Sequence, residues 1–222
     1  MDHFGGAYNE GRVMMSGRRD NQPSLFDDED LGKYSAPTQA RLEYLIDSNC
    51  LMTPYNEYYS PDFFLSESFW NQLHRQVIQG SVGIIRPVYQ EVFQSGGKKT
   101  GFNQKLNQWL RELEKDGHIL PINNAVIGQY ADVINYLRES PDFSDIAVER
   151  WSEISVADPW LIAFAKADSD ESSSVRVVTF ERKSGHMDPH QPSSNPKIPD
   201  VADHFGVSTI TLFEFMRREG IY

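Results

Sequence analysis

The chain has 222 residues, of which 39% are hydrophobic and 24% charged, and its formal net charge is −11 at pH 7. This length fits one domain with a tail, and no apolar run approaches the ~20 residues of a membrane-spanning helix. Because neutralising phosphates takes Lys and Arg, the acidic balance argues against a general nucleic-acid-binding protein. It still allows an enzyme that holds phosphates through bound metal and a local basic patch.

Two features bear on the compartment. The first residues, Met1-Asp2-His3-Phe4-Gly5-Gly6, lack the charged-then-apolar pattern of a secretion signal, so a cytoplasmic protein is expected. The single cysteine, Cys50, excludes an internal disulfide framework and a Cys-rich zinc site. Since Cys50 follows an apolar stretch, we predict a buried thiol rather than a reactive one.

Residues 1–40 are rich in Gly, Ser, Asn and Asp and show no periodic apolar spacing. We predict that they form a disordered tail and that residues 41–222 form a single domain. The acidic run at residues 27–30 is interpreted as a solvated part of this tail rather than as a metal site.

The first half of the domain alternates short apolar runs with helical patterns. Residues 42–47 and 82–85 are predicted as strands, and residues 61–79 carry large apolar side chains at helical spacing. Pro87 suits the first turn of a helix after the second strand. Residues 102–115 predict a further helix with four large apolar side chains on one face.

The second half continues this alternation. Residues 124–137 predict a helix, and residues 157–167 predict a buried helix that opens with an acid and a proline. Residues 175–180 are a strand rich in β-branched side chains. Residues 183–196 are predicted as an unusually long loop because they are rich in Gly, His, Ser and Pro.

The C-terminal part predicts a helix over residues 198–205, an edge strand over 208–210 and a helix over 212–219 that Gly220 ends. Strands interleaved with helices imply an α/β fold: a mostly parallel central sheet with right-handed crossovers, flanked by helices.

Four acids follow the predicted strands or open helices: Asp47, Glu91, Asp158 and Glu181. In an open α/β sheet the carboxyl ends of the strands form the edge where ligands bind. Four carboxylates gathered there would repel one another unless a cation lay between them. The expected cation is Mg²⁺ or Mn²⁺, because both prefer oxygen ligands.

These segments resemble the PIN-domain family of metal-dependent ribonucleases, and in particular a PIN-like branch with similar C-terminal segments. The resemblance covers roughly residues 42–222. The matching segments are Tyr44-Leu45-Ile46-Asp47-Ser48-Asn49, then Glu91, then Ala157-Asp158-Pro159-Trp160-Leu161-Ile162-Ala163-Phe164-Ala165, then Val177-Val178-Thr179-Phe180-Glu181, then Lys197-Ile198-Pro199-Asp200-Val201 and Phe213-Glu214-Phe215-Met216-Arg217.

The resemblance implies roles for particular residues. Asp47, Glu91 and Asp158 stand at the positions that bind the metal in the family, and Asn49 stands where a small polar residue supports the site. The fourth family acid is usually an Asp after the Val-Val-Thr strand. This chain has Glu181 there, and Asp200 is a rival for that role. The long helical insertion between Glu91 and Asp158 implies a different substrate groove.

The implied function is a metal-dependent endoribonuclease that hydrolyses RNA phosphodiester bonds, acting as the toxin of a toxin–antitoxin module. RNA and a cognate antitoxin are then the expected partners, and a homodimer stays open. One alternative is a catalytically inert PIN-like scaffold that binds protein, favoured by Glu181 and the acidic composition. Another is an acid-cluster nuclease that cleaves DNA.

Each singled-out residue also has a plain structural interpretation. Asp47 and Asp158 could cap a turn and a helix, and Glu91 and Glu181 could be solvated acids. His186 and His190 are interpreted as part of a flexible loop rather than as metal ligands. The basic pairs at residues 98–99 and 217–218 could meet RNA phosphates or simply face solvent. The four tryptophans are assigned to the core: Trp70, Trp109, Trp151 and Trp160.

Overall fold

A computed structural model describes residues 40–60, 63–96, 104–170, 173–185 and 190–221. Its centre is a five-stranded sheet in the order β3-β2-β1-β4-β5, and every pair of neighbouring strands is parallel. The predicted α/β fold with a parallel central sheet is therefore confirmed. The strands are β1 (Tyr44–Ile46), β2 (Val82–Ile85), β3 (Ile119–Leu120), β4 (Arg176–Val178) and β5 (Thr209–Ile210).

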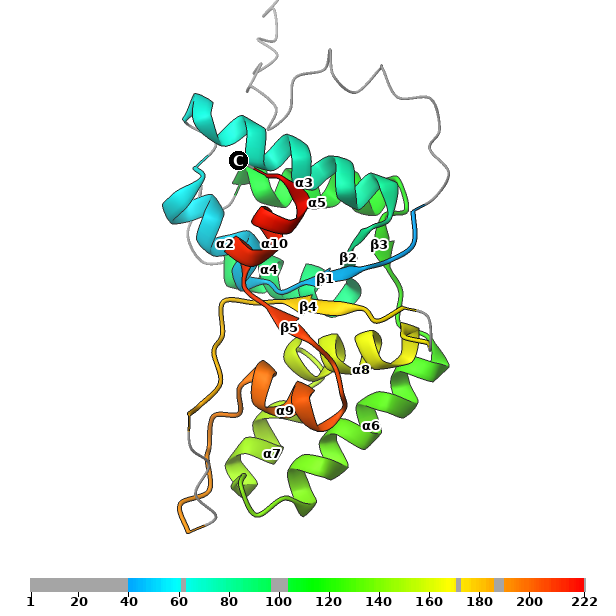
Figure 1. Cartoon of the computed structure of the whole chain (residues 1–222), viewed down its shortest axis with the longest axis vertical. Coiled ribbons are helices and arrows are strands. Elements are labelled where there is room, and N and C mark those ends of the chain that lie inside the picture. The colour runs from blue at the N-terminus through cyan, green and yellow to red at the C-terminus, as the bar shows by residue number, and fades with distance from the viewer. Residues whose placement is uncertain (1–39, 61–62, 97–103, 171–172, 186–189, 222) are drawn as a thin grey trace, which may run out of the picture.

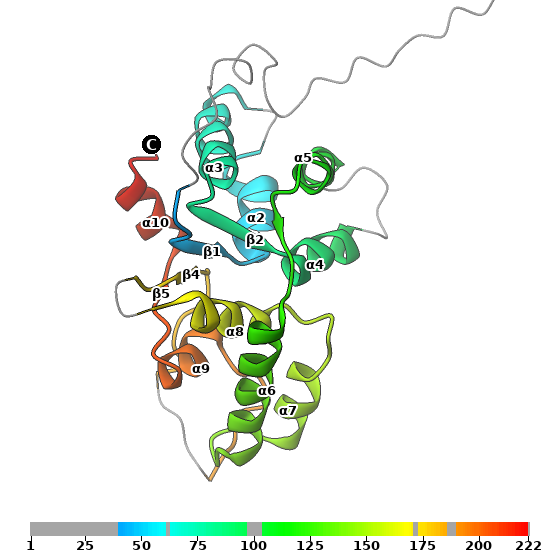
Figure 2. The same cartoon turned by 90° about the vertical axis from the view of Figure 1, so that its right-hand side faces the viewer.

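Helices cover both faces of the sheet (Figures 1 and 2). One face carries α3, α5 and α10, and the other carries α6, α8 and α9. The helices are α2 (Asn49–Thr53), a π-helix (Pro54–Tyr58), a 3-10 helix (Phe64–Ser66), α3 (Glu67–Gln79), α4 (Arg86–Gly96), α5 (Gln104–Lys115), α6 (Asn124–Glu139), α7 (Asp145–Trp151), α8 (Asp158–Asp168), α9 (Ile198–His204) and α10 (Leu212–Glu219).

The strand order reverses at β1. The chain runs from β1 outward through β2 to β3, and then crosses back to β4 on the other side of β1. Tyr44 of β1 is in register with Val82 of β2 and with Arg176 of β4. The carboxyl ends of β1 and β4 thus flank the topological switch point, which is where ligands bind in open α/β sheets.

The core lies on both faces of β1 and β2, whose residues are all buried. Both strands read as continuous apolar runs, because parallel strands are covered on two sides. The apolar helix α8 is buried and packs against α6, α9 and β4. The predicted apolar face of α5 is confirmed, and all four tryptophans belong to the core.

Several predicted boundaries are confirmed closely. The C-terminal helix α10 spans the predicted residues, with Gly220 after it at φ 66° in the left-handed region. Thr211 and Glu214 form a reciprocal capping box at its start. The predicted edge strand is β5, at the end of the sheet.

Other predicted elements differ from the structure. The helix predicted over residues 61–79 begins only at Glu67, and the strand predicted over 175–180 spans Arg176–Val178. The sequence patterns did not predict α2, the π-helix, β3 or α7. These elements have two to seven residues, which is too short for a repeating apolar pattern, so tertiary packing determines them.

Some predictions fall outside the described residues: the tail up to residue 39, the acidic run 27–30, the basic pair 98–99, and His186. The described parts of the predicted loop over residues 183–196 contain no helix or strand. Among the described residues, no helix is both long enough and apolar enough to cross a membrane.

Candidate active site

Asp47 is the first residue after β1, and its side chain is completely buried. Its backbone N–H donates to the Val178 carbonyl at 3.0 Å, which holds the end of β1 against β4. The Thr179 hydroxyl Oγ1 donates to Oδ2 of Asp47 at 2.9 Å. The carboxylate of Asp47 therefore lies at the switch point and is fixed by the residue that follows β4.

The next two residues, Ser48 and Asn49, also hydrogen-bond the Asp47 carboxylate. The Ser48 hydroxyl lies 3.3 Å from Oδ1 of Asp47 and also hydrogen-bonds Glu91. Asn49 donates its backbone N–H to the Asp47 carboxylate, while its side chain is exposed. Side-chain hydrogen bonds to Asp47 come from Ser48 and Thr179, and the supporting role of the Asn49 side chain stays a prediction. Sequence reasoning missed both Ser48 and Thr179, although a hydroxyl residue directly beside the acid was the available signal.

Glu91 reaches the same place from α4, the helix that begins directly after β2. Burial raises the pKa of its carboxyl above the usual value, and the Ser48 hydrogen bond partly opposes this shift. One hydroxyl proton cannot satisfy both Asp47 and Glu91, so Ser48 compensates the two charges incompletely.

Asp158 is the first residue of α8. Ala157 occupies the N-cap position, so the structure does not support Asp158 as a simple helix cap. Burial raises the pKa of Asp158 well above its usual range, and the charges of Asp47, Glu181 and Glu91 raise it further. Arg150 of α7 acts in the opposite direction.

The pKa of Asp47 shows that these acids act on one another. Burial is the largest effect and raises this pKa to about 6, while the Thr179 hydrogen bond opposes the shift. The charges of Glu91 and Glu181 also raise it. Carboxylates that share a buried place cannot all ionise without a compensating charge, so a bound cation would stabilise the cluster.

Glu181 lies two residues beyond Thr179, and its charge acts on both Asp47 and Asp158. Both carboxylate oxygens of Glu181 also contact residues at the start of α9. Lys197 Nζ lies 2.9 Å from Oε1, and the Ile198 backbone N–H at the start of α9 donates to Oε2 at 2.7 Å. Glu181 is therefore near the cluster but oriented by α9.

Asp200, the other candidate for the fourth acid, hydrogen-bonds Ser184. Its carboxylate accepts hydrogen bonds from the Ser184 backbone N–H, at 3.1 and 3.2 Å, and from the Ser184 hydroxyl. Asp200 is not among the charges that act most strongly on Asp47 or Asp158. The charge of Glu181 therefore acts on Asp47 and Asp158, whereas the carboxylate of Asp200 is engaged by Ser184.

The four acids supply only carboxylate oxygens, which match Mg²⁺ or Mn²⁺. As the side chains stand, no group of three or more His, Cys, Asp or Glu within the described ranges has a metal-holding arrangement. Asp47, Glu91 and Asp158 still fit a divalent cation chemically, because burial raises the pKa of all three carboxyl groups and the charges of Asp47 and Glu91 also disfavour ionisation of Asp158. They are the residues that would hold it.

Cys50, on α2, is buried, and its backbone N–H donates to the Asp47 carbonyl at 2.9 Å. Burial raises the pKa of its thiol well above the ordinary value, and the nearby Asp47 charge adds to this effect. A thiol held neutral in this way is a weak nucleophile, which agrees with the predicted structural role.

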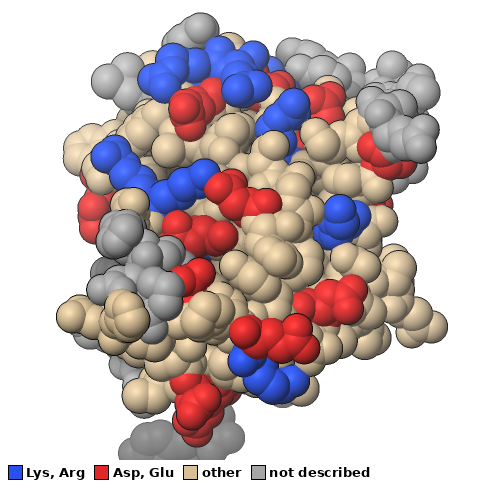
Figure 3. Space-filling model, turned by 60° about the horizontal axis from the view of Figure 1, so that its bottom comes forward, with Lys and Arg blue, Asp and Glu red and all other residues tan. Residues whose placement is uncertain are grey.

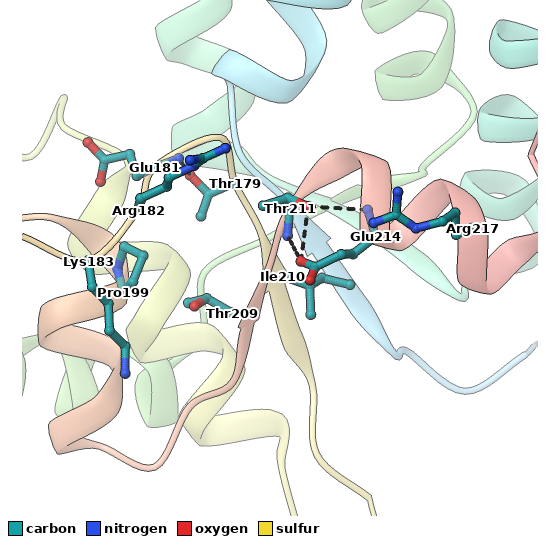
Figure 4. Close-up of a pocket in the computed structure, with 10 residues that line it drawn as sticks. All are labelled: Thr179, Glu181, Arg182, Lys183, Pro199, Thr209, Ile210, Thr211, Glu214 and Arg217. Atoms are coloured by element: carbon teal, nitrogen blue, oxygen red, sulfur yellow. Dashed lines mark hydrogen bonds between the residues drawn. The ribbon is translucent and has the colours of Figure 1, made fainter. Parts of the chain in front are cut away.

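A pocket of about 440 Å³ lies beside the cluster, at the carboxyl ends of β4 and β5 (Figure 4). Thr179 and Glu181 belong to both the pocket wall and the carboxylate site. Arg182 and Arg217 lie at two sides of the pocket, and Arg182 was not predicted from the sequence. Its other lining residues are Lys183, Pro199, Thr209, Ile210, Thr211 and Glu214.

Comparison with known proteins identifies a family for this chain. A family model described as a domain of unknown function, DUF4411, matches residues 44–222, which includes every acid of the cluster. No curated protein and no solved structure matches the chain.

Proposed function

We propose that this chain, which belongs to the DUF4411 family, is a metal-dependent endoribonuclease of the PIN-like type. One observation supports the proposal: Asp47, Glu91 and Asp158 come from three separate parts of the chain, and the charges of Asp47 and Glu91 act on Asp158 beside the switch point. Each of them has a raised pKa there. Structural acids are usually paired with cations or exposed, whereas these acids are buried or half-buried and the charges of Asp47 and Glu91 act on Asp158.

The residues of the candidate site would have the following roles. Asp47, Glu91 and Asp158 would hold Mg²⁺ or Mn²⁺, and Thr179 and Ser48 would orient the Asp47 carboxylate. A bound divalent cation polarises the scissile phosphate, lowers the pKa of an attacking water and stabilises the leaving oxygen. Glu181, held by Lys197, would add negative charge at the rim of the site. The proposal requires no side-chain nucleophile.

Purified variants test the proposal. Asp47→Asn and Asp158→Asn should each lose RNA cleavage in Mn²⁺ and bind Mn²⁺ at least about 10-fold more weakly by calorimetry. Asp200→Asn is the matched control, because its carboxylate is engaged by Ser184 outside the cluster. Full cleavage by a pure Asp47→Asn preparation would overturn the assignment.

The same variants separate a metal site from structural caps. In metal-free buffer, Asp47→Asn and Asp158→Asn should melt at the same temperature as the wild type or higher, because each removes one of several repelling charges. Loss of a helix or turn cap would instead cost about 1 kcal/mol and lower the melting temperature by several degrees.

We further propose that the enzyme is the toxin of a toxin–antitoxin module, with a cognate antitoxin as its protein partner. The support is the resemblance of the four acidic segments to such toxins. Expression of the chain alone should then arrest bacterial growth, and Glu91→Gln should abolish the arrest at equal protein level. Equal arrest by both forms would point to expression burden.

A catalytically inert protein-binding scaffold is the second candidate. The observation that favours it is Glu181, whose oxygens are already engaged by Lys197 and Ile198. A scaffold would bind no Mn²⁺ in the micromolar-to-millimolar range and cleave nothing. A DNA-cleaving enzyme would instead bind Mn²⁺ but cut a single-stranded DNA of the same sequence faster than the RNA.

A further inference from the structure

Three aromatic side chains from distant parts of the chain gather beside the carboxylate cluster. Tyr58 ends the π-helix, Phe180 follows β4, and Phe213 lies in the first turn of α10. Their ring centroids are 6.2 Å apart for Tyr58 and Phe180, 6.1 Å for Tyr58 and Phe213, and 5.9 Å for Phe180 and Phe213. We call these three residues the aromatic platform.

The aromatic platform faces solvent. Tyr58 is 53% exposed and Phe213 is 42% exposed, while Phe180 is partly buried against the core. A scattered exposed aromatic ring is ordinary, but rings brought together at the surface by three elements leave a continuous apolar area in water. Such an area is typical of a binding surface.

The aromatic platform is continuous with the proposed catalytic residues. Phe180 stands between Thr179, whose hydroxyl fixes Asp47, and Glu181. Phe213 stands between Thr211 and Glu214, which line the adjoining pocket. A molecule resting on the rings would therefore extend toward both the carboxylates and the pocket.

The pocket supplies positive charge next to the rings. Among the residues that the structure describes, Arg182 and Arg217 have no ion pair within 4 Å. The neighbouring charged groups are engaged: Lys183 pairs with Asp203, and Glu214 accepts from Thr211 in the capping box. Arg182 and Arg217 thus remain available for an anionic ligand (Figure 4).

We propose that the aromatic platform, together with Arg182 and Arg217, binds an unpaired nucleotide and its phosphates, and so positions a single-stranded nucleic acid beside the carboxylates. Aromatic faces for bases combined with cations for the backbone are the recognition mode of single strands. The inference rests on the proposed nuclease function, because it assigns the substrate of that site. A duplex keeps its bases stacked on one another, so it should bind much more weakly.

The test measures binding without cleavage. In an Asp158→Asn background with Mg²⁺, fluorescence anisotropy follows a labelled 8-nucleotide oligo-U, an oligo-dT of equal length and a matched duplex. Tyr58→Leu and Phe213→Leu should weaken single-strand binding at least about 5-fold, since one stacked base contributes that much or more. Phe213→Tyr keeps a ring and should retain binding.

Matched controls are present in the chain. Phe64 is 83% exposed and lies outside the aromatic platform, so Phe64→Leu should leave binding unchanged. Arg217→Gln and Arg182→Gln should weaken binding and reduce its salt dependence. Arg218→Gln, on the next residue of the same helix but outside the pocket lining, should do so less.

The outcomes distinguish this inference from the proposed function. The wild type could bind single strands through the aromatic platform and yet cleave nothing. That outcome would support the aromatic platform and reject the proposed nuclease function. RNA cleavage combined with equal binding by Phe213→Leu and Phe64→Leu would overturn the platform alone. Platform variants that lose a copurifying protein partner but keep oligonucleotide binding would also overturn it, in favour of a protein-docking surface.

Discussion

Thr179 is the side chain that joins the two strands flanking the switch point. Its hydroxyl donates to the buried carboxylate of Asp47 and accepts the backbone N–H of Glu181 at 3.1 Å. One residue thus orients the central acid and also fixes the turn that carries Phe180 and Glu181. This double role depends on a hydroxyl at this position.

We predict that Thr179→Val, which keeps the shape but removes the hydroxyl, lowers the free energy of unfolding by about 1–3 kcal/mol. The reason is that Asp47 loses a donor where water cannot replace it. Urea unfolding of wild type, Thr179→Val and Thr179→Ser measures the effect, and the serine variant should restore most of the loss. Equal stability of all three would mean that the hydrogen bond contributes nothing.

His74 is a partly buried titratable side chain outside the candidate site. Its Nδ1 accepts a hydrogen bond from Trp109 Nε1 at 3.0 Å, so the ring joins α3 to α5 in its neutral form. Burial lowers the pKa of His74 to about 4, and the nearby positive groups His118 and Arg75 add to the shift.

This lowered pKa predicts a pH dependence of stability. Because the folded pKa lies below the unfolded value of about 6.5, the neutral ring stabilises the fold fully above pH 6.5, and this contribution falls between pH 6.5 and 4. His74→Asn keeps an acceptor but does not titrate. The stability of the wild type relative to His74→Asn should therefore decline as the pH falls through this window. Parallel curves in urea unfolding would contradict the prediction.

At the scale of elements, β2 shows how tightly the sheet is packed. Gly83 stands in the middle of this buried strand, opposite Leu45 of β1. A Cβ added there would lie 2.5 Å from Leu120 Cδ1, 2.9 Å from Leu42 Cδ1 and 3.0 Å from Leu45 Cδ2. An added methyl group would therefore force the ends of these leucine side chains to shift.

We expect Gly83→Ala to destabilise the protein by about 1–3 kcal/mol, because three leucine side chains must move to admit one methyl group. Gly128 in α6 is the matched control, since an added Cβ meets nothing within 4 Å. There alanine should stabilise the helix by about 0.5–1 kcal/mol. Thermal unfolding should show a lower melting temperature for Gly83→Ala and a higher one for Gly128→Ala. A lower melting temperature for both variants would contradict the steric argument.

At the scale of the molecule, the net charge is strongly negative. Basic and acidic side chains are interspersed on the face shown in Figure 3, and neither sign forms a continuous stripe. With a net charge of −11, the whole surface should repel nucleic acid weakly. A nucleic-acid substrate would then depend on the bound cation and on local groups such as Arg182 and Arg217.

Removal of residues 1–38 tests the predicted division into tail and domain. This segment lacks periodic apolar residues, so it has little surface to bury and cannot offset the entropy lost on ordering. We expect the truncated protein to melt within about 3 °C of the full chain, on the scale of less than 1 kcal/mol. Its Mn²⁺ affinity should be unchanged. A larger drop would show that the segment packs on the domain.

The sequence by itself determined the long elements and the sheet class. The helices α5, α6 and α10 and the strands β1 and β2 follow from apolar spacing and from glycine or proline at their ends. These are local signals, since a side chain's position along a helix or strand fixes the face it occupies. The placement of Asp47 directly after β1 follows from the same local pattern.

Only the tertiary structure decided which distant side chains meet. The Glu181 charge acts on Asp47 and Asp158 while Asp200 bonds Ser184, and Thr179 is the hydrogen-bond partner of Asp47 across 132 positions of sequence. The short elements α2, β3 and α7 likewise depend on packing. The physical reason is that sequence periodicity reports the environment of one element, whereas a site at a switch point depends on how separate elements pack together.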